Sequence, residues 1–409
     1  MLAAALLSKV PFCLAVAAPP ASDEKLLQFM QQVRPQPAAN QAGGTAVREA
    51  TTVPPERLKE RADLLKAGEA ALARMDANAA IDSFDRAALI LHAADTEIAL
   101  VRAYMQNGQY RRALAFGAHM AGAHLDVIGG SALYAWLLHA GGQGVIAQRL
   151  LAEADARLPN NAMLARAQLQ LKAGTPLATG NLLTLPTRLA PYGSSRGLPP
   201  AARVLGSGLL IGDGGLALVP LALLPRSGNF WLRNGLGNLS RGTVQKHLPS
   251  TDVALVRLES PLPAPENLWA APADAFPGSV GYAVEYVASR DSTPAWPVLR
   301  TGFLGAAIGD GSERLLGIDM PAGPRGGPVF DAAGRLTGLA LPGRLDKSGR
   351  SPTHDRLVPL SALQTQLRSS VQATAIWGSP PPADLPPRAA ADRIYETSLK
   401  ASVQLIGMP

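Results

Sequence analysis

The sequence predicts a multidomain α + β protein, with a helical-repeat stack in its N-terminal part and a domain of short strands in its C-terminal part. Three observations support this prediction. Alanines and glycines recur every 33 or 34 residues in the first part. Short apolar runs broken by Gly-rich turns fill the second part, and one loop there reads GPRGGPVF, from Gly323 to Phe330. A chain of 409 residues is long enough for two or three domains.

The N-terminal residues 1–18 resemble a secretory signal peptide. An apolar run from Val10 to Ala18 carries small residues that suit cleavage after Ala17, although Lys9 interrupts the apolar region. The run is too short to span a bilayer, and nothing else in the chain reaches about 18 uninterrupted apolar residues. We expect a periplasmic or secreted protein that is not transmembrane, or a cytoplasmic one if this segment is not a signal. Residues 19–55, rich in Ala, Pro, Gln and Thr, are predicted to form a flexible lead-in.

Residues 56–174 are rich in Ala and Leu and carry apolar residues at helical spacing. Ala80, Ala113 and Ala147 are 33 and 34 residues apart, and Gly108 and Gly142 are 34 apart. This period, with small residues at helix contacts and a turn between paired helices, resembles tetratricopeptide repeats. The resemblance implies about three helix pairs and a concave groove that binds an extended peptide or a helix. An irregular helical bundle is the alternative.

Several polar and aromatic residues of this part are candidates to line such a groove. Each of them could instead pack in the interior of the stack, because aromatic residues at helical spacing usually do so. They are Arg102, Tyr104, Tyr110, Tyr134, Trp136 and His139.

Residues 175–203, with Gly, Pro and Ser and little periodicity, are predicted to be a linker to a domain at 204–370. Three segments of that domain resemble trypsin-like serine proteases, most closely the HtrA-like branch. Gly206 to Leu224 resembles the strands that lead to the catalytic histidine, and Thr251 to Leu258 resembles the strand headed by the catalytic aspartate. Gly323 to Phe330 resembles the loop of the nucleophilic serine. The resemblance implies a trypsin-like double β-barrel.

The residue-by-residue comparison with that family predicts a degenerate triad. The histidine position falls on Ala222, the aspartate on Asp252 and the serine on Arg325. A methyl group cannot carry a proton, a guanidinium has no lone pair for attack, and the aspartate alone only orients an imidazole. The loop would still offer backbone N–H groups at Gly323 and Arg325, as in an oxyanion hole. We expect no functional catalytic residue, a local hydrogen bond at Asp252, and an Arg325 that plugs the cleft or binds a carboxylate.

Other residues do not restore the missing chemistry. His247 is predicted to lie in a polar connection and His354 in a loop, and both are expected to be solvated histidines rather than general bases. Ser312 and Ser348 lack the flanking glycines of a nucleophile loop. The single cysteine, Cys13, is interpreted as a small apolar residue of the N-terminal segment. Since the chain has no C-x-x-C, H-E-x-x-H or phosphate-loop motif, we expect no metal and no cofactor.

The end of the chain departs from the pattern of the family. Residues 371–390 are predicted to be a Pro-rich linker, and residues 391–409 a helix-strand tail. This tail resembles the opening of HtrA-like domains, whose first strand is hard to find before Gly206. We hypothesise that a strand from about Ala401 to Ile406 completes the barrel, in cis or in trans. A truncated second domain is the alternative.

These features together predict a pseudoprotease: a non-catalytic protein-binding scaffold exported to the cell envelope. Its partner would be a protein or an extended peptide, bound in the helical-repeat groove or in the inactive cleft. The net charge of +7 comes from scattered Lys and Arg residues without a basic block, so we expect no nucleic-acid partner. An active HtrA-like serine endopeptidase and a periplasmic chaperone or assembly factor are the alternatives.

Overall fold

The fold is taken from a computed structural model. It describes residues 53–173, 190–309, 311–320, 325–344, 354–367, 382 and 386–408. The predicted signal peptide, nearly all of the lead-in, Gly323, Ser348 and most of the Pro-rich linker lie outside the described residues. No helix in the described part of the chain is both long enough and apolar enough to cross a membrane.

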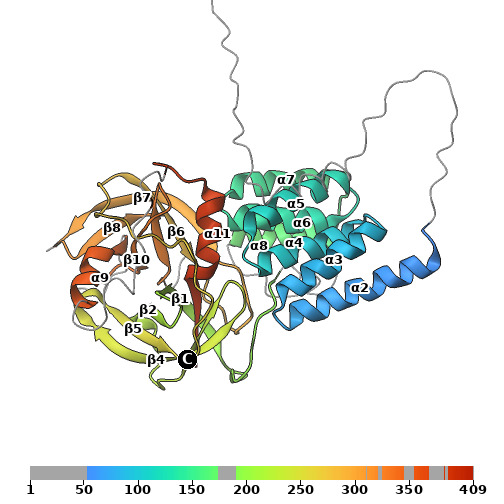
Figure 1. The fold of residues 1–409 in the computed structure, drawn as a ribbon. Helices are drawn as coiled ribbons and strands as arrows, with labels where there is room; N and C mark the ends of the chain where they lie inside the picture. The colour runs from blue at the N-terminus through green and yellow to red at the C-terminus, as the bar shows by residue number, and fades with distance from the viewer. Residues whose placement is uncertain are drawn as a thin grey trace, which may run out of the picture. The chain divides into compact units, whose positions relative to one another are not determined.

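The N-terminal part consists of successive helices that pack against their neighbours in the chain (Figure 1). Three of them, α4, α6 and α8, begin at residues 94, 128 and 162, which gives a repeat of 34 residues. The helices are α2 (Pro55–Ala73), α3 (Ala77–Ile90), α4 (Ala94–Gln106), α5 (Tyr110–Ala123), α6 (Ile128–Ala140), α7 (Gly144–Arg157) and α8 (Ala162–Ala173).

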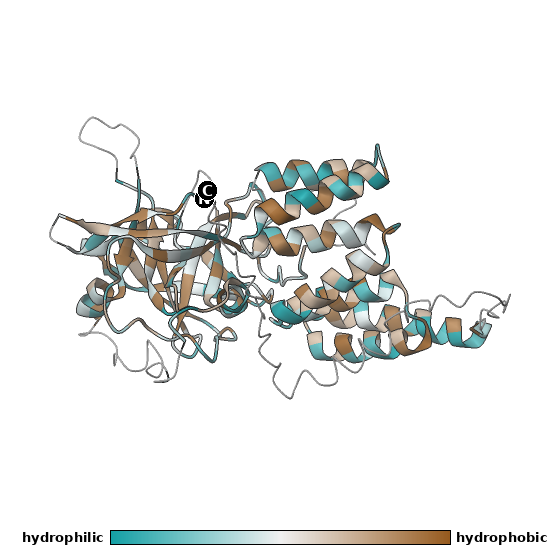
Figure 2. Cartoon of the chain, turned by 90° about the horizontal axis from the view of Figure 1, so that it is seen from above, coloured by the Kyte–Doolittle hydropathy of each residue, from teal (hydrophilic) through white to brown (hydrophobic). Residues whose placement is uncertain are grey.

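The periodic small residues have the roles that their spacing predicts. Ala80, Ala113 and Ala147 are fully buried where neighbouring helices meet. Gly108 and Gly142 have φ values of 73° and 85°, a left-handed conformation that glycine adopts without steric cost, and each lies between two paired helices. Around the helix axes, apolar and polar residues alternate (Figure 2), as expected for amphipathic helices with one buried face.

The candidate groove residues pack mainly inside the stack. Tyr110 is fully buried, and Tyr104, Arg102, Trp136 and His139 are at most 6% exposed. Tyr134 is half-buried. Arg102 forms a bidentate ion pair with Glu69, with N···O distances of 2.6 and 3.0 Å. The interior role is therefore the one that the structure supports for these side chains.

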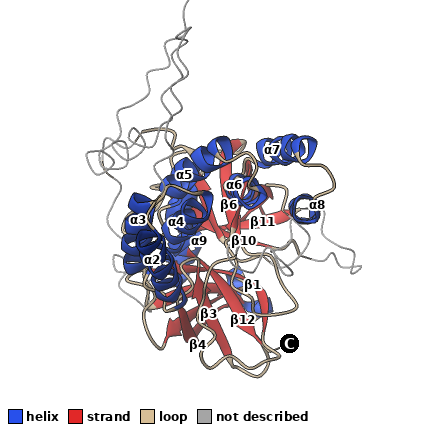
Figure 3. Ribbon diagram, turned by 90° about the vertical axis from the view of Figure 1, so that its right-hand side faces the viewer, coloured by secondary structure: helices blue, strands red, loops and turns tan. Residues whose placement is uncertain are grey.

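The C-terminal part contains two closed, antiparallel barrels of six strands each (Figure 3). The first has the order β1-β12-β3-β4-β5-β2, and the second has the order β10-β11-β8-β7-β6-β9. This is the trypsin-like double β-barrel. Its strands are β1 (Arg203–Ile211), β2 (Leu216–Pro220), β3 (Phe230–Asn234), β4 (Leu239–Leu248), β5 (Val253–Leu258), β6 (Ser279–Glu285), β7 (Val298–Ile308), β8 (Glu313–Gly317), β9 (Pro328–Asp331), β10 (Leu336–Leu341), β11 (Asp355–Pro359) and β12 (Ser402–Gly407).

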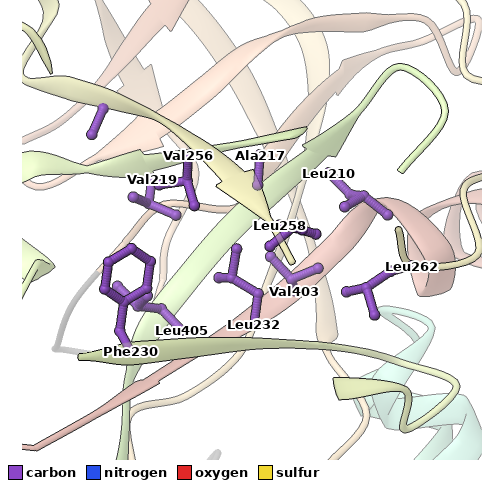
Figure 4. Close-up of a cluster of buried hydrophobic side chains, with 11 residues drawn as sticks. Leu210, Ala217, Val219, Phe230, Leu232, Val256, Leu258, Leu262, Val403 and Leu405 are labelled. Carbon is purple, nitrogen blue, oxygen red and sulfur yellow. The ribbon is translucent and has the colours of Figure 1, made fainter. Parts of the chain in front are cut away.

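The last strand of the chain closes the first barrel. β12 follows helix α11 (Ala391–Ala401) and lies between β1 and β3 of the same chain (Figure 3), with antiparallel ladders on both sides. Val403 and Leu405 point into the apolar core beside Phe230 and Leu232 (Figure 4). Without β12, the facing edges of β1 and β3 would be unpaired.

One polar side chain of β12 also fixes the strand. Gln404 is 2% exposed, and its Oε1 accepts a hydrogen bond from Nε of the fully buried Arg233 at 2.8 Å. Arg233 in β3 also donates to the carbonyl oxygens of Ser194 and Ser292. Because a buried guanidinium is stable only when its donors are satisfied, β12 contributes a polar partner as well as apolar surface.

His247 corrects one sequence-based expectation. It lies inside β4 opposite Ala254 of β5, and not in a polar connection between elements. Its side chain is exposed. The strand runs on through His247, whose exposed side chain precedes the buried Leu248. Gln245 and His247, two residues apart, therefore lie on the same solvated face of the strand.

Candidate functional site

The three triad positions converge between the ends of several strands. Ala222 lies in the short 3-10 helix Leu221–Leu223, which directly follows β2, and the N–H of Leu221 donates to the carbonyl oxygen of Asp252 at 2.9 Å. Gly326, next to Arg325, packs so closely that an added Cβ would lie 2.1 Å from the carbonyl oxygen of Ser207 and 2.8 Å from Cδ of Pro220. These contacts bring Ala222, Asp252 and Arg325 near one another in the fold.

Asp252 is held by arginines that are distant in sequence. Its Oδ2 accepts hydrogen bonds from Nε and Nη2 of Arg344 at 3.2 and 3.1 Å and from Nη2 of Arg356 at 2.8 Å. The expectation of a local hydrogen bond is corrected by these contacts. Asp252 has a left-handed backbone, with a φ of 54°, at the residue before β5. Aspartate is among the few residues other than glycine that tolerate this conformation.

Glu313 joins the same two arginines into a four-membered network. Its Oε1 accepts a hydrogen bond from Nη2 of Arg344 at 2.9 Å and a further one from Nη1 of Arg356. The side chains of Glu313 and Arg356 are 7% and 8% exposed, whereas those of Asp252 and Arg344 are 40% and 57% exposed. The ion pair between Glu313 and Arg356 is therefore the stronger interaction, because solvent screens the exposed pair of Asp252 and Arg344.

Arg325 forms an internal ion pair with Asp355. Its Nε and Nη2 donate to Oδ2 of Asp355 at 2.8 and 2.6 Å, and Nη2 also lies 3.4 Å from the carbonyl oxygen of Met320. The residue is only 6% exposed. The guanidinium, at the position that the resemblance assigns to the nucleophile, is neutralised from within the protein, which favours the plug over a site for an external carboxylate.

Glu285 is the residue of this site that sequence reasoning missed. It ends β6, is 4% exposed, and its Oε1 accepts a hydrogen bond from the N–H of Gly327 at 3.2 Å. Its Oε2 has no hydrogen-bond partner in the described part of the chain. Burial raises the pKa of Glu285 to about 8, against the lowering effects of Arg325 and of the Gly327 hydrogen bond. The only signal in the sequence is an acidic residue at the end of the apolar run GSVGYAVEYV.

The arrangement provides ion pairs and a carboxylic acid, and it lacks the groups for acyl transfer at the triad positions. Ala222 offers a methyl group, Asp252 is bound to two arginines, and Arg325 is bound to Asp355. The backbone N–H of Gly327, which follows the nucleophile position by two residues, is directed to Glu285. His354 directly precedes β11 and has an exposed side chain.

No protein-family model and no curated protein matches this chain. Solved structures resemble it at low identity. The HtrA-type protease AlgW with decapeptide is 19% identical with a TM-score of 0.32, over 40% of this chain and 50% of that one. The MamO protease domain from Magnetospirillum magneticum is 19% identical with a TM-score of 0.30, over 44% and 100%. The Rv3671c protease from M. tuberculosis in its active form is 16% identical with a TM-score of 0.32, over 45% and 84%.

The chain thus spans half of the AlgW chain that it matches. The assignment of the trypsin-like fold rests on the two closed six-stranded barrels and their strand order, and the resemblances concern the fold alone.

Proposed function

We propose that this protein is a non-catalytic protein-binding scaffold, in which an inactive trypsin-like barrel is combined with a helical stack that resembles tetratricopeptide repeats. The main support for this proposal is the identity and pairing of the residues at the predicted triad positions. The position that the resemblance assigns to the base holds Ala222, and the charged groups of Asp252 and Arg325 form ion pairs within the protein. An enzyme without base and nucleophile retains only the acceleration due to binding and oxyanion stabilisation.

An exposed apolar strip on the second barrel supports the binding part of the proposal. Val280 of β6 and Phe303 of β7 face each other in the ladder and are 39% and 53% exposed. Leu315 of β8 and Phe276, just before β6, are 38% and 81% exposed. Since neighbouring exposed apolar residues such as Val280 and Phe303 mark interaction sites, we infer that a protein or an extended peptide binds this strip.

Export to the periplasm or to the exterior is a further part of this proposal, supported by the apolar run and small residues within residues 1–18. Cell fractionation with an epitope at the C-terminus tests it. Processing after Ala17 in the soluble envelope fraction is expected, and an unprocessed protein in the cytoplasm would contradict it.

Catalysis is tested with the full chain on casein and with a fluorophosphonate that labels active serine nucleophiles. We expect neither cleavage above a blank nor labelling, and the same result for Asp252→Ala. The double variant Ala222→His/Arg325→Ser serves as a control, because it restores the base and the hydroxyl at the triad positions. Casein cleavage by the parent that disappears in Asp252→Ala would overturn the non-catalytic assignment.

Partner binding is tested by capture from envelope extract on immobilised parent protein and on Phe303→Ser. A partner that is bound by the parent and lost by Phe303→Ser is expected. Val145→Ser is the matched control, because Val145 is an equally apolar side chain of α7 that is 76% exposed. Equal capture by Phe303→Ser and the parent would exclude the apolar strip as the binding site.

A further inference from the structure

Three of the six histidines of the chain surround one buried carboxylate in the helical stack. The carboxylate belongs to Glu97, whose side chain is 1% exposed. Nε2 of His92 lies 2.5 Å from its Oε1, Nε2 of His119 lies 3.3 Å from the same oxygen, and Nε2 of His124 lies 3.4 Å from Oε2. These histidines are the ion-pair partners of Glu97 among the described residues, and neither the fold nor the triad explains them.

Two helix ends assemble this cluster. His92 lies between α3 and α4, and Glu97 is in the first turn of α4. His119 is in the last turns of α5, and His124 directly follows that helix. The electrostatics of helix ends suit the cluster, because the start of a helix favours a carboxylate and the end of a helix favours a cation.

Several polar atoms of this cluster lack a hydrogen bond to any described residue. Oε2 of Glu97 and Nε2 of both His119 and His124 are buried without a hydrogen-bond partner in the described part of the chain. Leaving such groups without hydrogen bonds in the interior costs free energy. The nearby cation Arg61 does not relieve this, since its guanidinium pairs with Asp95 and with Oγ1 of Thr96.

The spacing of the ligand atoms fits a metal ion. The ligand atoms of His92, Glu97 and His124 all lie within 4.8 Å of one another. Four ligands at about 2.0–2.1 Å around a tetrahedral zinc ion are about 3.3 Å apart. Nε2 of His119 lies 3.3 Å from Oε1 of Glu97 and Nε2 of His124 lies 3.4 Å from Oε2, so both separations are close to this value but involve different carboxylate oxygens. His92 must move outward from 2.5 Å, and the imidazoles must rotate to share one ion with the same carboxylate oxygen.

We propose that His92, Glu97 and His124 bind one zinc ion and that His119, whose Nε2 lies 3.3 Å from Oε1 of Glu97, rotates to supply the fourth ligand. Imidazole nitrogen and carboxylate oxygen are ligands that zinc favours, and three neutral imidazoles with one carboxylate leave the site with a net positive charge that the end of α5 stabilises. Four protein ligands fill a tetrahedral shell, so the ion has a structural role. It ties the α3–α4 connection to the end of α5 and thereby fixes the second helix pair of the stack.

This proposal is independent of the proposed function, and it departs from the sequence-based expectation of no metal. That expectation rested on the absence of short metal motifs. Here the ligands come in two pairs, each five residues apart, His92 with Glu97 and His119 with His124. Neither spacing is a zinc motif, because i and i+5 do not share a helix face, and the site exists only where two helix ends meet.

The test uses the full chain without an affinity tag, stripped with a chelator and then titrated with ZnCl2. We expect one zinc per chain with a dissociation constant below about 1 µM, and a melting temperature that rises by at least about 5 °C at saturating zinc. Cobalt(II) in place of zinc should give the intense visible absorption of a tetrahedral ion.

Variants distinguish this site from surface binding. Glu97→Gln and His124→Ala should each weaken zinc binding by about 100-fold or more, beyond the 10- to 100-fold loss typical of an outer-shell group. His247→Ala is the matched control, because His247 is exposed on β4, and it should bind as the parent does. If Glu97→Gln fails to fold, His124→Ala still decides, since its side chain is 20% exposed. No zinc uptake by the parent, or parent-like affinity in His124→Ala, would overturn the proposal.

Discussion

Replacement of Glu285 by glutamine should remove a specific pH dependence of stability. Glu285 is 4% exposed at the end of β6, and burial raises its pKa to about 8. Glutamine has nearly the same shape as the protonated acid and can accept the same hydrogen bond from Gly327. The variant therefore resembles the parent at low pH and differs from it only where the parent must ionise a buried carboxyl.

The size of the effect follows from proton linkage. In the folded protein Glu285 keeps its proton up to about pH 8, whereas in the unfolded chain it loses the proton near its ordinary pKa of 4.5. Between these values the folded state binds more protons, so the free energy of unfolding falls as pH rises, by about 1.4 kcal/mol per pH unit. Over the whole window the free energy of unfolding falls by about 4–5 kcal/mol. This stabilisation is fully present below pH 4.5 and is lost above pH 8.

The measurement is urea unfolding of the parent and of Glu285→Gln at several values between pH 5 and pH 9. We expect similar stability near pH 5 and a glutamine variant that is more stable than the parent by several kcal/mol at pH 9. Glu259→Gln is the control, because Glu259 is exposed and should leave the pH dependence unchanged. Parallel pH profiles for parent and Glu285→Gln would refute the reasoning, since they would mean that Glu285 is ionised in the folded protein.

Two further predictions concern the closing strand and the helical stack. Ending the chain after Arg388 removes Val403, Leu405 and Ile406, three fully buried side chains whose burial is worth about 1.5–3 kcal/mol each, so the melting temperature should fall by more than about 15 °C or folding should be lost. Ending the chain after Gly407 is the control and should change the melting temperature little. An unchanged melting temperature after the longer deletion would contradict the role of β12. Burial, with a smaller effect of Arg300, lowers the pKa of His139 to about 4, so the free energy of unfolding should decrease as pH falls from 6.5 to 4. His139→Gln should reduce that loss, measured by acid unfolding followed by circular dichroism. An equal loss in both proteins would count against a neutral buried imidazole.

The sequence was informative where the signal is local or periodic. The 34-residue repeat predicted the succession of helices, the buried alanines such as Ala113, and the left-handed glycines between helices. Short motifs marked Ala222, Asp252 and Arg325, and the double β-barrel followed from the order of the segments that carry them. Such signals can be read from the sequence alone because helix periodicity, turn chemistry and a loop motif each depend on residues within a few positions of one another.

The tertiary structure decided the partners of each charged group. Asp252 is paired with Arg344 and Arg356, which are 92 and 104 residues away. Glu97 meets His119 and His124 only because the start of α4 packs against the end of α5.

The place of the last strand was decided in the same way. β12 lies about 200 residues from β1 in the sequence, and the apolar alternation of Ser402–Gly407 would fit many sheet edges. Register and ion pairing depend on which distant surfaces are left open once the rest of the chain has packed. Sequence periodicity carries no information about those distant surfaces. The sequence therefore determined the secondary-structure elements and the residues at the predicted triad positions, whereas the packed fold determined the closed barrel, the buried acid and the histidine cluster.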